Sequence, residues 1–89
     1  MSSRRTRSFH NAFDSLPDEV KERATDAFRL FQGDPHHRSL RLKKVHASEP
    51  IYSVRITLSY RALALRANKD WIWFWIGSHA DYEKLLNQL

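Results

Sequence analysis

Arg61 is the charged residue whose sequence context says most about chemistry. In the segment "SYRALAL" it shares its strand parity with Leu63 and Leu65. An arginine on a mostly apolar strand face is unfavourable without a partner. One interpretation is an ion pair with Asp or Glu. The other is a phosphate site, because the guanidinium group matches two phosphate oxygens at once.

Further cations stand on the segments around Arg61. Positive charges on adjacent strands are what a nucleic-acid groove needs, although a solvated strand face carries them too. The candidates for phosphate or RNA binding are Arg41, Lys43, Lys44 and Arg55.

A histidine and a tyrosine follow the apolar run "WIWFWI". His79 and Tyr82 are three residues apart, so a helix would place both on one side. Histidine exchanges protons near neutral pH, and cations stabilise a crowded phosphorane, so this set would suffice for metal-free RNA cleavage by 2′-hydroxyl attack. The structural alternative is that His79 only starts a helix and Tyr82 belongs to its apolar stripe.

No metal or cofactor site is expected. His36 and His37 are adjacent and point apart in an extended loop, and His10 and His46 have no companions. The chain has no cysteine, and two glycines are too few for a phosphate-binding loop.

The helical period predicts a hairpin of two helices over residues 9–33, preceded by a short edge strand from Arg5 to Phe9. Ser8 is the expected N-cap of the first helix, and Gly33 the end of the second. The stripe of the first helix comprises Phe9, Ala12, Phe13 and Leu16.

Period two then predicts strands in "LRLKKV", "IYSVRITL", "YRALALRA" and "WIWFWIG". Short links make them antiparallel neighbours. In the last strand, alternation sets the three tryptophans on one face and Ile72, Phe74 and Ile76 on the other. One face would meet the hairpin. The other would meet the C-terminal helix, a partner or stacked bases.

A final helix begins near Ser78, which forms a capping pair with Asp81. The order is β-α-α-β-β-β-α, an α+β fold with a helical hairpin on a small, mainly antiparallel sheet. With 89 residues we expect a single domain, 1–89.

Charge favours a polyanion or an acidic protein as partner, although it also serves solubility. Lys and Arg number 15 against 10 acidic residues, a net charge of +5. No apolar run spans a membrane and "MSSRRTRSF" is not a secretory signal, so we expect a cytoplasmic protein with no membrane contact.

The order and spacing of these segments resemble the RelE/ParE toxin superfamily of bacterial toxin–antitoxin systems over nearly the whole chain. The most specific pieces are "YSVRI…YRAL" and "WIGSHADYEKLL". The resemblance implies a compact toxin wrapped by a cognate antitoxin. Many RelE-like members are ribosome-dependent mRNA endonucleases, whereas ParE-like members poison DNA gyrase.

Carried over residue by residue, the resemblance makes Arg61 the arginine of a Tyr-Arg motif and Arg55 a basic strand position. His79 falls where nucleases of the family often have arginine or histidine, and Tyr82 near their terminal tyrosine. Ser53 stands where some members have lysine. The resemblance therefore implies a toxin that cleaves mRNA in the ribosome without a metal. The alternatives are a gyrase-inhibiting toxin and a non-toxic basic binding module.

Overall fold

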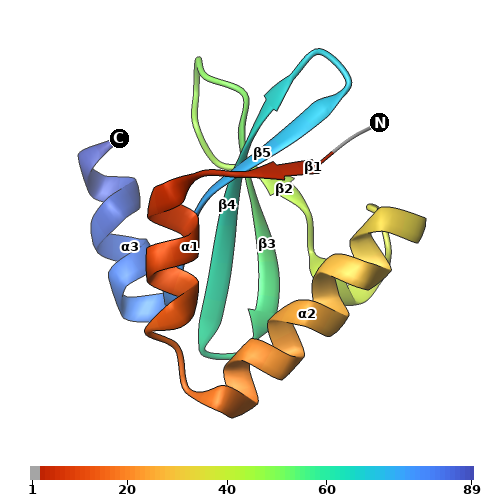
Figure 1. Ribbon diagram of the computed structural model, residues 1–89. Coiled ribbons are helices and arrows are strands. Elements are labelled where there is room, and N and C mark those ends of the chain that lie inside the picture. The colour runs from red at the N-terminus through yellow and green to blue at the C-terminus, as the bar shows by residue number, and fades with distance from the viewer. Residues whose placement is uncertain (1–2) are drawn as a thin grey trace.

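The computed structural model describes residues 3–89; the first two residues of the opening segment lie outside it. In this part of the chain three α-helices and a 3-10 helix accompany five strands, which confirms the predicted α+β class (Figure 1). The elements are β1 (Ser3–Arg5), α1 (Arg7–Asp14), α2 (Asp18–Gly33), η1 (Arg38–Leu40), β2 (Lys43–Lys44), β3 (Ile51–Thr57), β4 (Tyr60–Ala67), β5 (Asp70–Ser78) and α3 (His79–Gln88).

The strands form one sheet in the order β1-β5-β4-β3-β2. β1 runs parallel to β5, and all other neighbours are antiparallel, as predicted. Helices α1 and α2 pack on one side, here called the hairpin face, and α3 packs on the other, the α3 face. The sheet is therefore covered on both sides, which explains why β5 is apolar on both.

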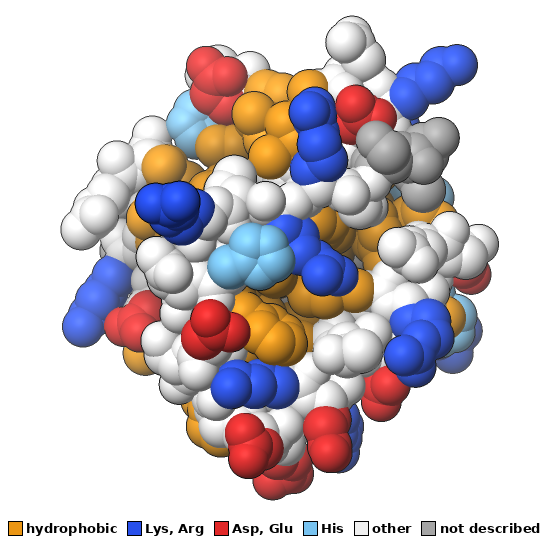
Figure 2. Space-filling model, viewed as in Figure 1, with side chains coloured by type: hydrophobic (Ala, Val, Ile, Leu, Met, Phe, Trp, Pro, Cys, Tyr) orange, Lys and Arg blue, Asp and Glu red, His pale blue; other side chains and the backbone are white. Residues whose placement is uncertain are grey.

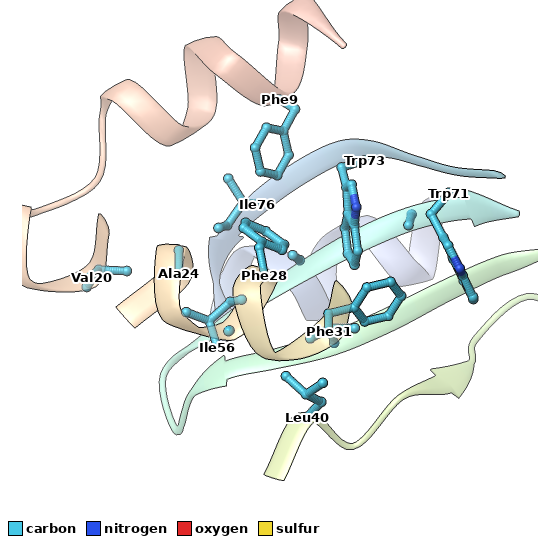
Figure 3. Close-up of a cluster of buried hydrophobic side chains, with 14 of the residues drawn as sticks. Phe9, Val20, Ala24, Phe28, Phe31, Leu40, Ile56, Trp71, Trp73 and Ile76 are labelled. Carbon is cyan, nitrogen blue, oxygen red and sulfur yellow. The ribbon is translucent and has the colours of Figure 1, made fainter. Parts of the chain in front are cut away.

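Aromatic rings fill the space between α2 and the sheet (Figure 3). Trp71, Trp73 and Phe31 are each 1% exposed. The ring of Phe31 lies 5.2 Å from that of Trp71 and 5.1 Å from that of Trp73, both edge to face. Each such burial stabilises the fold by about 1.5–3 kcal/mol, so two of the three tryptophans are structural.

Strict alternation along β5 is wrong after Trp73. Residues 63–64 of β4 pair with Trp75 and Trp73, which leaves Phe74 without a partner in the ladder. This bulge reverses the parity, so Trp75 turns to the α3 face and Ile76 to the hairpin face.

The N-terminal prediction is shifted by several residues. The strand ends at Arg5 and the helix begins at Arg7, where a strand to Phe9 was expected. The N-cap is Thr6, whose hydroxyl accepts a hydrogen bond from the Phe9 N–H at 3.1 Å. Ser8, the predicted cap, instead donates to a β5 carbonyl.

The predicted strand "LRLKKV" is mostly irregular. Leu40 closes η1, and Arg41 has a left-handed backbone with φ of 48°. A strand cannot continue through this conformation, so only Lys43–Lys44 join the sheet. Leu58, the last residue of the predicted strand "IYSVRITL", lies beyond β3 in the β3–β4 turn and is 75% exposed.

No helix among residues 3–89 is long and apolar enough to cross a membrane. The surface in Figure 2 carries charges of both signs, with acidic side chains gathered at its lower end. The net positive charge of the chain is therefore not concentrated on this side.

Candidate functional site on the α3 face

Arg61 is anchored by the turn between β3 and β4. Its Nη1 donates to the carbonyl oxygens of Thr57 at 2.6 Å, Tyr60 at 3.0 Å and Leu58 at 3.3 Å. No ion pair within residues 3–89 involves Arg61. Of the two interpretations of Arg61, the ion pair is therefore not seen within these residues, and backbone carbonyls hold the guanidinium with no acidic partner.

A second arginine stands directly opposite. Arg55 pairs with Arg61 across the β3–β4 ladder, so both side chains lie on the α3 face. Burial lowers the pKa of Arg61, and the charges of Arg55 and Arg41 lower it further, while Tyr82 acts in the opposite direction. Three cations close enough to repel one another are relieved by an anion, which phosphate provides.

The two lysines of β2, Lys43 and Lys44, lie on opposite faces of the sheet. Lys43 pairs with Ser53 and lies on the α3 face at the edge of the sheet. Lys44 pairs with Tyr52 and lies on the hairpin face, where its ammonium group donates to the backbone carbonyls of residues 46–47. The structure therefore does not bring Lys44 together with the other cations predicted to bind phosphate, because adjacent strand residues point to opposite sides.

His79 and Tyr82 lie together at the start of α3. Ser78 caps the helix as predicted, and the two rings are 5.7 Å apart. The imidazole is half-exposed, and its Nε2 lies 3.5 Å from a carboxylate oxygen of Glu83. Tyr82 is 4% exposed within a hydrophobic cluster, so the structural alternative holds for most of its ring.

Trp75 is the residue of this face that sequence reasoning did not single out. Its indole lies directly over Gly77, where a Cβ would come within 2.6 Å of its Cζ2 atom. Its ring centre is 6.5 Å from that of Tyr82. Since Gly77 pairs with Arg61, the indole lies beside the arginines. A glycine inside a strand marks such a close approach and was the available signal.

Residues 3–89 contain no cluster of three histidine, cysteine or acidic side chains able to hold a metal. The arrangement consists instead of one anchored arginine, Arg61, with further cations near it, a histidine and a half-buried indole. Cations with a titratable group beside them can bind a phosphodiester and move protons at it.

Solved structures of similar fold include several toxins. YafQ from E. coli strain BL21(DE3) superposes with a TM-score of 0.74 at 9% identity, over 90% of this chain and 94% of that one. RelE, solved with RelB from Methanococcus jannaschii, gives 0.72 at 14% identity over 92% and 96%. The RelBE2 complex from Mycobacterium tuberculosis gives 0.70 at 17% identity over 88% and 96%.

Sequence comparison is more specific about the family. No curated protein sequence is significantly similar to this chain. The family model of the ParE-like toxin domain, however, matches residues 18–84, which run from the start of α2 into α3. The chain therefore belongs to the ParE-like toxin domain family, and its fold is the one that RelE and YafQ share.

Proposed function

We propose that this toxin is a metal-independent endoribonuclease that cleaves mRNA on the ribosome and is neutralised by a cognate antitoxin. The observation that carries the proposal is the uncompensated pair Arg55 and Arg61, with His79 at the end of the neighbouring strand. Proteins of the same fold include YafQ and RelE, and both RelE from Methanococcus jannaschii and the RelBE2 toxin from Mycobacterium tuberculosis were solved in complex with an antitoxin.

The arginines hold the phosphate in this proposal. The 2′-oxygen attacks phosphorus, its proton passes to a base, and negative charge builds on the phosphorane oxygens. Arg61 and Arg55 stabilise that charge. Arg41 and Lys43 bind neighbouring phosphates of the RNA. The bond to the 5′-oxygen then breaks as an acid protonates it, leaving a cyclic phosphate and a free hydroxyl.

His79 transfers the protons in this proposal, and Tyr82 beside it assists. Glu83 lies within ion-pair distance of the imidazole and orients it. Because the tyrosine ring is almost fully buried, we assign the larger share to His79. No metal, cofactor or membrane enters the proposal.

The test is mRNA cleavage in a translating cell extract, mapped by primer extension. Wild type should cut messages that are being translated, and Arg61→Ala should not. Arg29→Ala serves as control, because Arg29 is exposed on α2 and paired with Asp26. Intact mRNA with active wild-type protein would overturn the proposal.

A second candidate is inhibition of DNA gyrase, which the ParE-like family model favours. It needs no catalytic histidine. His79→Ala and Tyr82→Phe would then leave toxicity intact, and induction would alter plasmid supercoiling while mRNA stays whole.

A further inference from the structure

A groove of about 920 Å³ opens between α2, η1 and the β3–β4 hairpin. Figure 1 shows the first turns of α2 and the β3–β4 turn together at the lower end of the molecule. Four arginines and one acidic residue, Glu19, are among the side chains that line the groove. The arginines come from three separate segments, and they are Arg23, Arg38, Arg41 and Arg55.

None of these four arginines forms an ion pair within residues 3–89. Glu19 stands one helical turn before Arg23, yet no ion pair joins them, and none within residues 3–89 involves Arg38. Elsewhere on the same helix, Lys21 and Arg29 are each paired with an aspartate three residues before them. The groove is therefore the part of α2 where cationic charge stays open to an external anion.

The groove is continuous with the candidate site. Arg55 belongs to both, since it lines the groove and stands opposite Arg61. Thr57 and Tyr60, whose carbonyls hold Arg61, line the groove as well. An extended polyanion lying in the groove would thus reach Arg61 along one surface.

We propose that this groove binds the phosphodiester backbone of single-stranded RNA, next to the phosphate held by Arg61, with Arg23 and Arg38 as its outer contacts. The inference rests on the proposed function and names where the substrate strand runs. Guanidinium forks match phosphate oxygens, and charges spread along a groove suit the regular spacing of a nucleic-acid backbone. An acidic peptide is the competing occupant.

The test measures binding of a short fluorescein-labelled 2′-O-methyl RNA, which lacks the attacking hydroxyl and stays intact. Fluorescence anisotropy over a range of NaCl concentrations gives the slope of log K against log salt. Arg23→Gln with Arg38→Gln should weaken binding and reduce the slope by about 0.7 per lost phosphate contact. The matched control, Arg29→Gln, should bind as wild type does.

Two outcomes would overturn the groove proposal. In one, the double variant binds RNA with wild-type affinity and slope. In the other, it keeps RNA binding but loses binding of labelled poly-L-glutamate, which would assign the groove to an acidic protein. Melting curves of the double variant and of Arg29→Gln, followed by circular dichroism, show whether either variant is misfolded.

Failure of the groove differs from failure of the proposed function. A changed salt slope without mRNA cleavage by wild type would support RNA binding in the groove and contradict the nuclease. Cleavage by wild type together with an unchanged salt slope in the double variant would support the nuclease and contradict RNA binding in the groove.

Discussion

His79 donates its backbone N–H to the carbonyl oxygen of Ser59 at 2.7 Å. The first residue of α3 is thereby attached to the β3–β4 turn, the same turn whose carbonyls hold the guanidinium of Arg61. One short turn thus sets the positions of both Arg61 and His79, to which the proposed function gives phosphate binding and proton transfer.

Substitution of His79 should abolish most cleavage without unfolding the protein. His79→Ala removes the proton carrier, and we expect cleavage to fall about 100-fold or more. Tyr82→Phe should have a smaller effect, because that residue is almost fully buried. The measurement is the rate of mRNA cutting in a translating extract.

Glu83→Gln tests how far the carboxylate beside His79 supports it. The His79–Glu83 pair is exposed on both sides, so its loss should leave the melting temperature unchanged. Cleavage should fall less than with His79→Ala, because the imidazole itself is kept. Equal cleavage by His79→Ala and wild type would remove the histidine from the mechanism.

Replacing Arg61 should weaken both the fold and the activity. Arg61→Ala frees three turn carbonyls, and we expect the free energy of unfolding to fall by about 1–2 kcal/mol. Arg61→Lys keeps the charge but loses the planar fork, so it should recover stability in part and cleavage poorly. Urea unfolding and the cleavage assay measure the two effects, and full cleavage by the lysine variant would contradict bidentate phosphate binding.

Arg55→Gln should raise stability at low salt while lowering RNA binding. Because the folded-state pKa of Arg61 is lowered, its charge costs stability at every pH below that value, and Arg55 is the largest charged contributor. Removing it should add a few tenths of a kcal/mol, about the size of exposed pair effects. High salt should erase the gain in urea unfolding. Lower stability at low salt would show that the arginines do not repel each other.

Gly77→Ala should displace the indole of Trp75. The new Cβ would lie 2.6 Å from Cζ2, so we expect a loss of about 1–3 kcal/mol in urea unfolding. Gly33→Ala is the control, since its Cβ would meet nothing within 4 Å and its helical position favours alanine.

A double-mutant cycle separates the indole from the backbone. Trp75→Leu should remove much of the penalty of Gly77→Ala, because the clashing ring is gone. Additive effects of the two substitutions would mean that the close approach is not what makes Gly77 necessary.

Periodicity could place residues where the backbone is regular. Alternation set Arg61 on the face of Leu63, and helical spacing brought His79 beside Tyr82. Periodicity failed at Phe74, because in a run of apolar residues the sequence does not show which residue is left unpaired by a bulge. Alternation also sets Lys44 on the side opposite Lys43, so grouping both lysines with the phosphate-binding cations did not follow from the pattern.

The rest of the site depends on tertiary packing. The pairing of Arg55 with Arg61 requires the register fixed by the β3–β4 turn. Arg23 and Arg38 share a groove only because η1 packs near the first half of α2. Sequence spacing carries no information about that approach, so neither residue could be predicted.

The most direct test of the central claim is to induce the toxin and follow translation, mRNA integrity and plasmid supercoiling together in time. We expect amino-acid incorporation to stop first, with cuts in translated messages and unaltered supercoiling, and Arg61→Ala to abolish both effects. A change in supercoiling that precedes translation arrest, with mRNA intact, would contradict the account.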